Sequence, residues 1–180
     1  MAKDALIIVD VQNDFCEGGA LEVVGAAEIL AIINRLMSKF ELVIATQDYH
    51  PPDHCSFDLW PPHCIAGTEG AELRKGIMVD RIKHFVKKGT LENKEAYSGF
   101  QETDLSSFLK SRGVKTIYLC GLATDYCVKA TALDGLTEGF KVFVILDAIR
   151  AVSKETGGAA LKEMEDRGVE FVRSDSWETT

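Results

Sequence analysis

The chain has 180 residues, of which 46% are hydrophobic and 27% are charged, a composition typical of a globular protein with one hydrophobic core. Its formal net charge is −8 at pH 7, and no run of lysine or arginine exceeds two residues, which argues against nucleic acid as a partner. The longest apolar stretches are far shorter than the ~20 residues that cross a bilayer, so we expect no membrane span.

The chain shows no internal repeat, low-complexity tract or linker, and we expect a single domain over residues 1–180. The first ten residues, MAKDALIIVD, lack the hydrophobic region and cleavage site of a signal peptide. Five cysteines, an odd number, do not make a complete disulfide framework. We therefore expect a cytoplasmic protein with reduced thiols.

Short apolar runs rich in β-branched residues predict strands over residues 5–9, 42–46, 82–86, 116–120, 142–146 and 169–172. Segments between most of these runs predict helices over residues 26–38, 104–111, 124–138 and 154–167. The strands are almost continuously apolar, as expected when both faces of a sheet are covered. The alternation predicts an α/β fold, with an open, doubly wound, mostly parallel six-stranded sheet and helices on both faces.

Reactive side chains follow several of the predicted strands. In open α/β sheets, ligands bind beyond the carboxyl ends of the strands, where the strand order reverses. Asp10 follows the first strand, Lys87 or Lys88 follows the third, and Cys127 comes soon after the fourth. Spacing alone does not decide between the two lysines. The sequence thus predicts a carboxylate, an amine and a thiol at one edge of the sheet.

Cys127 is the strongest candidate for a nucleophile. If Thr124 is the N-cap, Cys127 lies about three residues into a helix, where free N–H groups and the helix dipole favour a thiolate. Asp10 could then accept and return the thiol proton. The alternative is a small buried side chain, the commonest fate of a free cysteine, which we expect for Cys120.

One loop, QDYHPPDHCSFDLWPPHCIAGT, contains all four prolines and three of the four histidines. Asp48 and His50 are two residues apart, so both side chains point the same way if the chain is extended. Together with His63 they form a carboxylate–imidazole set that suits a catalytic metal ion. Cys55 and Cys64 lack the close pairing of structural zinc sites and are weaker candidates. The alternative is a polar loop with hydrogen-bonded histidines.

Five motifs occur in order along the chain: IIVDVQNDFCEGGAL, TQDYHPPDHCSF, WPPHCIAGTEGAEL, KKGTLENKEAYSGF and GLATDYCVKATALD. They resemble the motifs of nicotinamidases (pyrazinamidases) in the isochorismatase-like cysteine hydrolase superfamily, over nearly the whole chain. The resemblance implies an isochorismatase-like, Rossmann-like fold. It also implies a metal-dependent amidohydrolase that converts nicotinamide to nicotinate and ammonia through a cysteine thioester. Acceptance of pyrazinamide and a role in pyridine nucleotide salvage, within NAD metabolism, are further implications.

The resemblance also implies roles for individual residues. Asp10, Lys88 and Cys127 match the catalytic triad of the family, which selects Lys88 over its neighbour. The N–H groups of Ala123 and Cys127 match the oxyanion hole. The peptide bond between Leu122 and Ala123 matches a bond that is cis in the family.

The same resemblance implies how a metal ion and a ring are bound. Asp48, His50 and His63 match the ligands of one divalent metal ion, for which zinc is favoured, although iron and manganese also suit such a site. His54 stands where some members have a fourth ligand and others do not. Three aromatic residues match those that sandwich the pyridine ring: Phe15, Trp60 and Tyr97.

Two alternatives remain open. Another isochorismatase-like amidohydrolase, acting on N-carbamoyl or ureido substrates, would have no obvious use for the predicted metal ligands. A non-catalytic metal-binding module on the same scaffold would have no use for an intact triad. We therefore expect a small-molecule substrate, a pyridine or pyrazine carboxamide. The sequence leaves open whether the chain forms a homo-oligomer.

Overall fold

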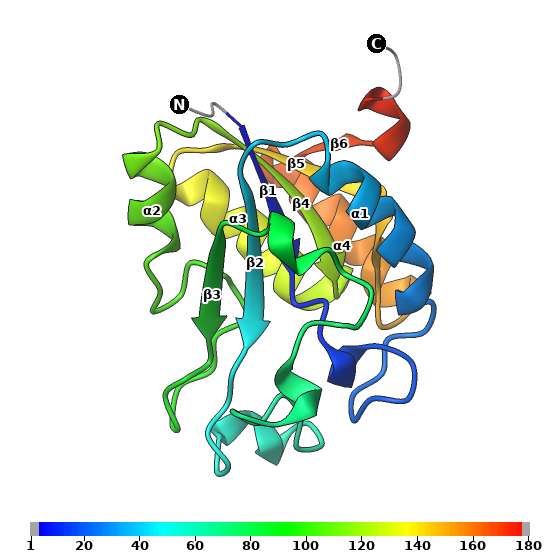
Figure 1. Ribbon diagram of the computed structural model, residues 1–180, viewed down its shortest axis with the longest axis vertical. Coiled ribbons are helices and arrows are strands. Elements are labelled where there is room, and N and C mark those ends of the chain that lie inside the picture. The colour runs from blue at the N-terminus through cyan, green and yellow to red at the C-terminus, as the bar shows by residue number, and fades with distance from the viewer. Residues whose placement is uncertain (1–3, 178–180) are drawn as a thin grey trace.

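The computed structural model describes residues 4–177, and in this part of the chain six strands form one sheet (Figure 1). The strands are β1 (Asp4–Val9), β2 (Val43–Asp48), β3 (His84–Lys88), β4 (Thr116–Leu122), β5 (Lys141–Arg150) and β6 (Glu170–Val172). Their order is β3-β2-β1-β4-β5-β6, and each neighbouring pair is parallel. The predicted α/β sheet is confirmed, and it is parallel throughout.

Helices cover both faces of this sheet. They are α1 (Leu30–Met37), α2 (Leu105–Ser111), α3 (Lys129–Thr137) and α4 (Lys154–Arg167). Side chains of α1 join one hydrophobic cluster, whereas side chains of α2, α3 and α4 join the other (Figure 1). Within residues 4–177, none of the helices has the length and apolar character needed to cross a bilayer.

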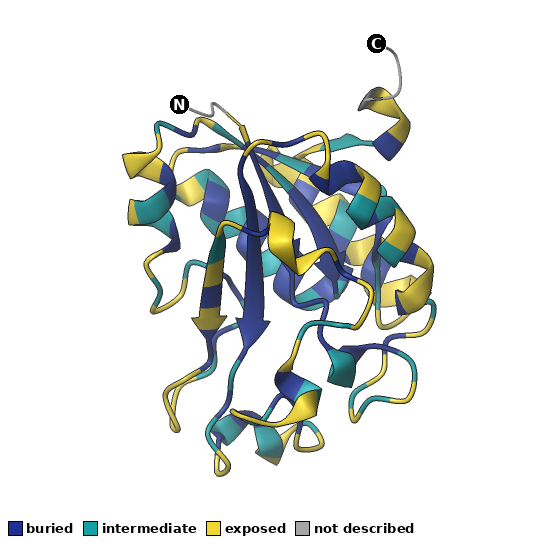
Figure 2. Ribbon diagram, in the orientation of Figure 1, coloured by how far each residue is buried: buried dark blue, intermediate teal, exposed yellow. Residues whose placement is uncertain are grey.

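The burial of β1 explains its unbroken apolar sequence. Leu6 and Ile8 point into the cluster on the α1 side, while Ala5, Ile7 and Val9 point into the cluster on the other side. Successive side chains of a strand alternate between faces, so a strand covered twice needs apolar residues at every position. Figure 2 shows the result, with the central strands buried along their length and the outer sides of the helices exposed.

Several predicted strand ends are wrong. The apolar run at 82–86 begins in a turn, where the N–H of Ile82 donates to the carbonyl of Val79, and β3 pairs with β2 only from His84 to Lys88. Strand β5 continues to Arg150, and its pairing with β4 resumes after a shift in register in which the extra residues, 145–148, lie in β5. Hydrophobicity reports burial, whereas strand ends are set by main-chain pairing, so the two limits differ.

Two predicted helices are subdivided. Residues 26–38 form a 3-10 turn over Ala26–Ile29 before α1 begins, and residues 124–138 begin with a π-helical turn over Thr124–Val128 before α3. Ala123, and not Thr124, is the N-cap of that turn, and its side chain makes no capping hydrogen bond. The condition that Thr124 is the N-cap, from which a thiolate at Cys127 is inferred, is therefore not met. Rare π-turns often occur at functional sites, and this one contains Cys127.

The strand order reverses beside β1. From β1 the chain proceeds outward through β2 to β3, and it then returns to β4 on the other side of β1. The carboxyl ends of these strands lie at the lower edge of the sheet in Figure 1, where the long loop after β2 also lies. This is the edge at which the sequence predicts the ligand crevice.

Gly121 controls the approach of β4 to β1. Its φ is +114°, and a Cβ atom on it would lie 2.1 Å from the carbonyl oxygen of Val9. We predict that Gly121→Ala lowers the free energy of unfolding by about 3 kcal/mol, because it combines an unfavourable φ with a clash against main chain. Gly158→Ala is the matched control, since nothing lies within 4 Å of its added methyl group. Thermal or urea unfolding of both variants measures the effect, and equal stability would contradict it.

Candidate active site

The ammonium group of Lys88 is buried at the carboxyl edge of the sheet. Its Nζ lies 2.5 Å from Asp48 Oδ1, 2.9 Å from Asp10 Oδ2 and 3.4 Å from Cys127 Sγ, and it donates to the carbonyl of Ala96 at 3.0 Å. The structure thus brings together the three residues that the resemblance assigns to a triad. It adds Asp48, a predicted metal ligand, as the closest partner of the amine.

Strand alternation separates the two candidate lysines. Lys88 shares the buried side of β3 with Val86 and is only 1% exposed. Lys87 points to the other side, where its Nζ lies 3.7 Å from the ring centroid of Tyr49 at the surface. The period of two in a strand therefore places one lysine in the site and the other outside it.

The two carboxylates beside Lys88 differ in proton affinity. Burial raises the pKa of Asp10; the Lys88 ammonium opposes this effect, and the charge of Asp48 adds to it. Burial also acts to raise the pKa of Asp48, but Lys88 and His50 outweigh burial and hold that pKa well below its usual range. Asp48 therefore stays ionised, while Asp10 is the carboxylate able to take up a proton.

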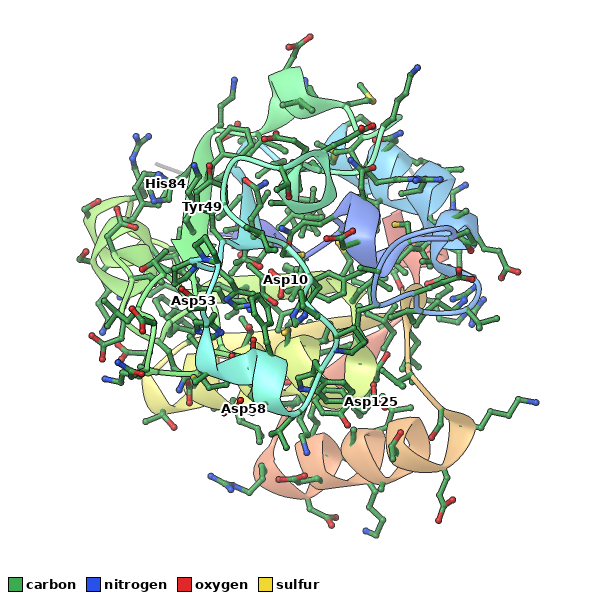
Figure 3. All side chains as sticks on the ribbon, turned by 90° about the horizontal axis from the view of Figure 1, so that it is seen from below. Asp10, Tyr49, Asp53, Asp58, His84 and Asp125 are labelled. Atoms are coloured by element: carbon green, nitrogen blue, oxygen red, sulfur yellow. The ribbon has the colours of Figure 1, made fainter. Side chains whose placement is uncertain are left out.

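A turn at the end of β1 fixes the carboxylate of Asp10. Its φ is +48°, its N–H donates to the carbonyl of Thr46 at 3.2 Å, and its Oδ1 accepts from the Thr46 hydroxyl at 2.6 Å. In Figure 3, which views the molecule from below, Asp10 lies near the centre, whereas Asp58 and Asp125 lie farther out. Asp10 is fully buried, so its carboxylate is held rigidly against Lys88.

Cys127 lies within reach of Asp10. One carboxylate oxygen of Asp10 and the Sγ of Cys127 are no more than 4.8 Å apart. Burial raises the pKa of the Cys127 thiol well above its usual value, although Lys88 acts to lower it. The expected stabilisation of a thiolate by the helix start is thus outweighed by burial in this state. A protonated thiol needs a base to become nucleophilic, and Asp10 is the nearest candidate.

The main chain before Cys127 has an unusual form. The peptide bond between Leu122 and Ala123 is cis, as the resemblance implies. Leu122, Ala123 and Cys127 all line the same pocket, and the fixed dipoles of N–H groups there could bind a developing oxyanion. The assignment of these N–H groups remains a prediction.

Asp48, His50 and His63 are gathered into one cluster beside the triad. Their ligand atoms lie within 4.8 Å of one another, and Asp48 Oδ2 is 3.6 Å from His50 Nε2. In both histidines Nδ1 is 2.8 Å from a carbonyl oxygen, that of Gly89 for His50 and that of Pro61 for His63. A carbonyl only accepts, so Nδ1 carries the hydrogen and Nε2 keeps its lone pair.

These residues fit a divalent metal ion. Nε2 of His50 is buried and has no hydrogen-bond partner among the described residues, as expected for an atom that faces a ligand. Burial lowers the pKa of His63, which favours the neutral imidazole that binds metals. Burial also acts to lower the pKa of His50, but Asp48 outweighs it and raises that pKa. A carboxylate and two imidazoles suit zinc, iron or manganese.

His54 lies against this cluster but has both ring nitrogens occupied. Its ring stacks on His50, Nδ1 accepts from the N–H of Ser56 at 3.2 Å, and Nε2 is 3.1 Å from the carbonyl of Lys94. Nε2 must donate to that carbonyl, so neither nitrogen offers a free lone pair. His54 thus connects two loops in this structure and does not present itself as a fourth ligand.

The cluster opens into a pocket with mainly aromatic and aliphatic walls. Phe15, Trp60 and Tyr97 line it together with Cys127, and the indole N–H of Trp60 donates to the Tyr97 hydroxyl at 3.2 Å. The pocket holds about 570 Å³ of empty space, part of which is open to solvent. The other lining residues are not among the candidates that the sequence offers: Leu21, Glu22, Val23, Glu95, Tyr126 and Val152.

Tyr126 is the most informative of the missed residues. Its ring meets the edge of Trp60 at a centroid distance of 5.3 Å and lies 5.8 Å from the ring of Tyr97. Its position next to the candidate nucleophile was the one available signal. A single tyrosine near a helix start does not reveal which rings it will contact, because those rings come from distant loops.

Comparisons with known proteins show which sequences and folds this chain resembles. A family model described as the isochorismatase domain matches residues 4–176. The nicotinamidase/pyrazinamidase of Mycobacterium tuberculosis is 41% identical, with 94% of this chain and 98% of that protein covered. The pyrazinamidase of Pyrococcus horikoshii, solved in complex with zinc, is 44% identical with a TM-score of 0.90, covering 95% of this chain and 99% of that one. PnC1 from L. infantum, solved in complex with nicotinate, is 37% identical with a TM-score of 0.94, and the match covers 97% of this chain and 94% of that one.

The hydrogen bonds of the histidines predict which of them hold a metal ion. We expect His63→Ala to lower the bound metal per folded chain about tenfold or more, because it removes a ligand with a free Nε2. His54→Ala, the matched control, should change it by no more than about twofold, because both nitrogens are already occupied. Elemental analysis after zinc loading and desalting measures both, and equal metal loss in the two variants would contradict the assignment.

Proposed function

The chain belongs to the isochorismatase domain family, and we propose that it is a nicotinamidase that converts nicotinamide to nicotinate and ammonia and also accepts pyrazinamide. One observation carries this proposal. The buried Lys88 ammonium contacts Asp10 and Cys127, and Cys127 lines a pocket with aromatic walls. The same ammonium contacts Asp48, the carboxylate of the candidate metal cluster. The relatives that act on nicotinamide or pyrazinamide support the choice of substrate.

The reaction begins with the thiol of Cys127. Asp10 takes the thiol proton, and Sγ attacks the carboxamide carbon to form a tetrahedral intermediate. Asp10 then gives the proton to the departing nitrogen, so that the C–N bond breaks, ammonia leaves and a thioester remains. Asp10 next removes a proton from water, which attacks the thioester. The C–S bond breaks, the thiol is restored and nicotinate is released.

Lys88 and the N–H groups at the pocket floor stabilise the charges of these steps. The Lys88 ammonium holds Asp10 in place and offsets its negative charge when the carboxylate is ionised. The raised pKa of Asp10 suits a group that must alternately bind and release a proton. The N–H groups of Ala123 and Cys127 would bind the oxyanion.

Asp48, His50 and His63 would hold one divalent metal ion, with zinc favoured. When bound, the ion supplies a Lewis acid for the pyridine nitrogen and so helps to orient the ring. The chain itself provides the rest of the ring site. Phe15, Trp60 and Tyr97 offer flat apolar surfaces that exclude water from the ring.

The charge of the pocket supports a neutral carboxamide over N-carbamoyl amino acids. Such substrates carry a carboxylate, which a pocket normally pairs with arginine or lysine. Among residues 4–177, no arginine or lysine is part of the pocket lining, whereas Glu22, Asp48 and Glu95 are. A neutral aromatic amide meets no such penalty. This difference favours nicotinamide over the alternative substrates.

The proposal is tested by ammonia release from nicotinamide. We expect the purified protein to release ammonia at a rate that falls at least about tenfold after chelation and recovers when zinc, iron or manganese is added back. A coupled ammonia assay measures the rate, with N-carbamoyl amino acids as comparison substrates. No release from nicotinamide after metal addition, together with release from an N-carbamoyl substrate, would overturn the assignment.

The nucleophile is tested separately. Cys127→Ala should lower turnover by at least about 10³-fold, because no other group can form the thioester, and should leave nicotinamide binding within a few-fold of the wild type. Cys120→Ala removes another buried thiol, inside β4, and should retain most of the activity. Turnover and calorimetric binding distinguish the two variants. Appreciable turnover by Cys127→Ala would exclude the thioester route.

A further inference from the structure

Gln12 is a buried residue that the mechanism does not use, and its side chain is bonded to the main chain of Asp48. Its Oε1 accepts from the Asp48 N–H at 2.8 Å. Its Nε2 donates to the Asp48 carbonyl at 2.8 Å and to the Ala71 carbonyl at 2.8 Å. Gln12 is 0% exposed, so no bulk water competes for these hydrogen bonds.

The position of Gln12 explains why a side chain is needed there. Main-chain pairing of β1 with β2 ends at Val9 and Thr46, and Asp10, with its positive φ, turns the chain away. Asp48 lies beyond this last pair and has lost its main-chain partner on the β1 side. The amide of Gln12 reaches back and satisfies both the N–H and the C=O of Asp48, as the next residue of a strand would.

The orientation of Asp48 matters because its two oxygens face different groups. Oδ1 is 2.5 Å from Lys88 Nζ, and Oδ2 is 3.6 Å from Nε2 of His50. On the β3 side, the N–H of the following residue, Tyr49, donates to the carbonyl of Lys88 at 2.9 Å. Fixed on both sides, Asp48 cannot rotate its main chain to give up one partner for the other.

We propose that Gln12 is a positioning residue for the metal site, which holds Asp48 so that one oxygen stays directed toward the metal ion while the other binds Lys88. This inference rests on the proposed function in one respect, namely that Asp48, His50 and His63 bind a metal ion. Gln12 is not itself a lining residue of the substrate pocket, and it contacts that lining through Asp48. Its effect is exerted through the main chain of Asp48.

If Gln12 only stabilised the fold, its replacement would leave the zinc affinity of the folded protein unchanged. Gln47 provides the control for this alternative. Gln47 is also a buried glutamine, it is adjacent to Asp48 in sequence, and its Nε2 donates to the same Ala71 carbonyl at 2.9 Å. Its side chain makes no hydrogen bond to Asp48 among those of the described residues. Loss of either amide leaves a buried carbonyl with fewer donors, but only loss of Gln12 frees Asp48.

The experiment compares Gln12→Met and Gln47→Met, which replace an amide by an apolar chain of similar length. Gln12→Asn is added because it keeps the amide but is one methylene shorter, so it cannot bridge the same groups. Zinc dissociation constants are measured on folded protein by competition with a chromophoric chelator. Circular dichroism and thermal unfolding measure folding, and KM and kcat for nicotinamide are determined at saturating zinc.

We expect both Gln12 variants to bind zinc about 10–100-fold more weakly than the wild type, the usual effect of removing a group that orients a metal ligand. KM should rise with little change in kcat when zinc is saturating. Gln47→Met should bind zinc within about threefold of the wild type.

Zinc affinity in the folded Gln12 variants equal to that of the wild type would overturn the inference. So would a failure of both Gln12 variants to fold while Gln47→Met folds, because Gln12 would then be a residue for stability alone. If the wild type itself binds no divalent metal, the metal part of the proposed function fails, and this inference fails with it. Metal binding without release of ammonia from nicotinamide would instead reject only the substrate.

Discussion

The burial of the Lys88 ammonium is the constraint on which the rest of the site depends. A lysine removed from water is strongly unfavourable unless opposite charges and acceptors replace the lost hydration. Asp10 and Asp48 supply the charges, and the carbonyl of Ala96 supplies a further acceptor. One buried ammonium cannot neutralise two buried carboxylates. The pKa of Asp10 is therefore raised, whereas that of Asp48 is lowered. That asymmetry separates proton transfer at Asp10 from permanent charge at Asp48.

Asp48 links this charge cluster to the histidines. One of its oxygens forms an ion pair with Lys88 and the other faces His50. The candidate metal site and the candidate triad therefore share the side chain of Asp48. The loops around them are joined in the same manner. His54 donates to the carbonyl of Lys94, and the indole of Trp60 donates to the hydroxyl of Tyr97, so the loops around the site support one another. Such mutual support holds reacting groups at fixed distances, which is how a site gains rate from position.

The limits of sequence interpretation are clearest where a local pattern has two solutions. Spacing did not choose between Lys87 and Lys88, because the choice depends on which face of β3 is buried. The helical segment begins at Thr124 as predicted, yet its first turn is π-helical and its N-cap is Ala123. Tyr126 and Gln12 escaped notice because their roles come from contacts with Trp60 and Asp48, which lie far away in sequence. No local signal encodes such partners.

Local sequence patterns are sufficient to predict the α/β class, the positions of the strands to within a few residues, and the residue types that collect at one edge. Apolar periodicity and the rule that parallel strands end at a common edge are local or general, so they need no coordinates. The folded chain was needed to show that Lys88 lies between two carboxylates, that His54 has no free nitrogen, and that Gln12 supports Asp48. These facts depend on distances between segments distant in sequence. Such distances are fixed only when the sheet has assembled and the loops have packed against it.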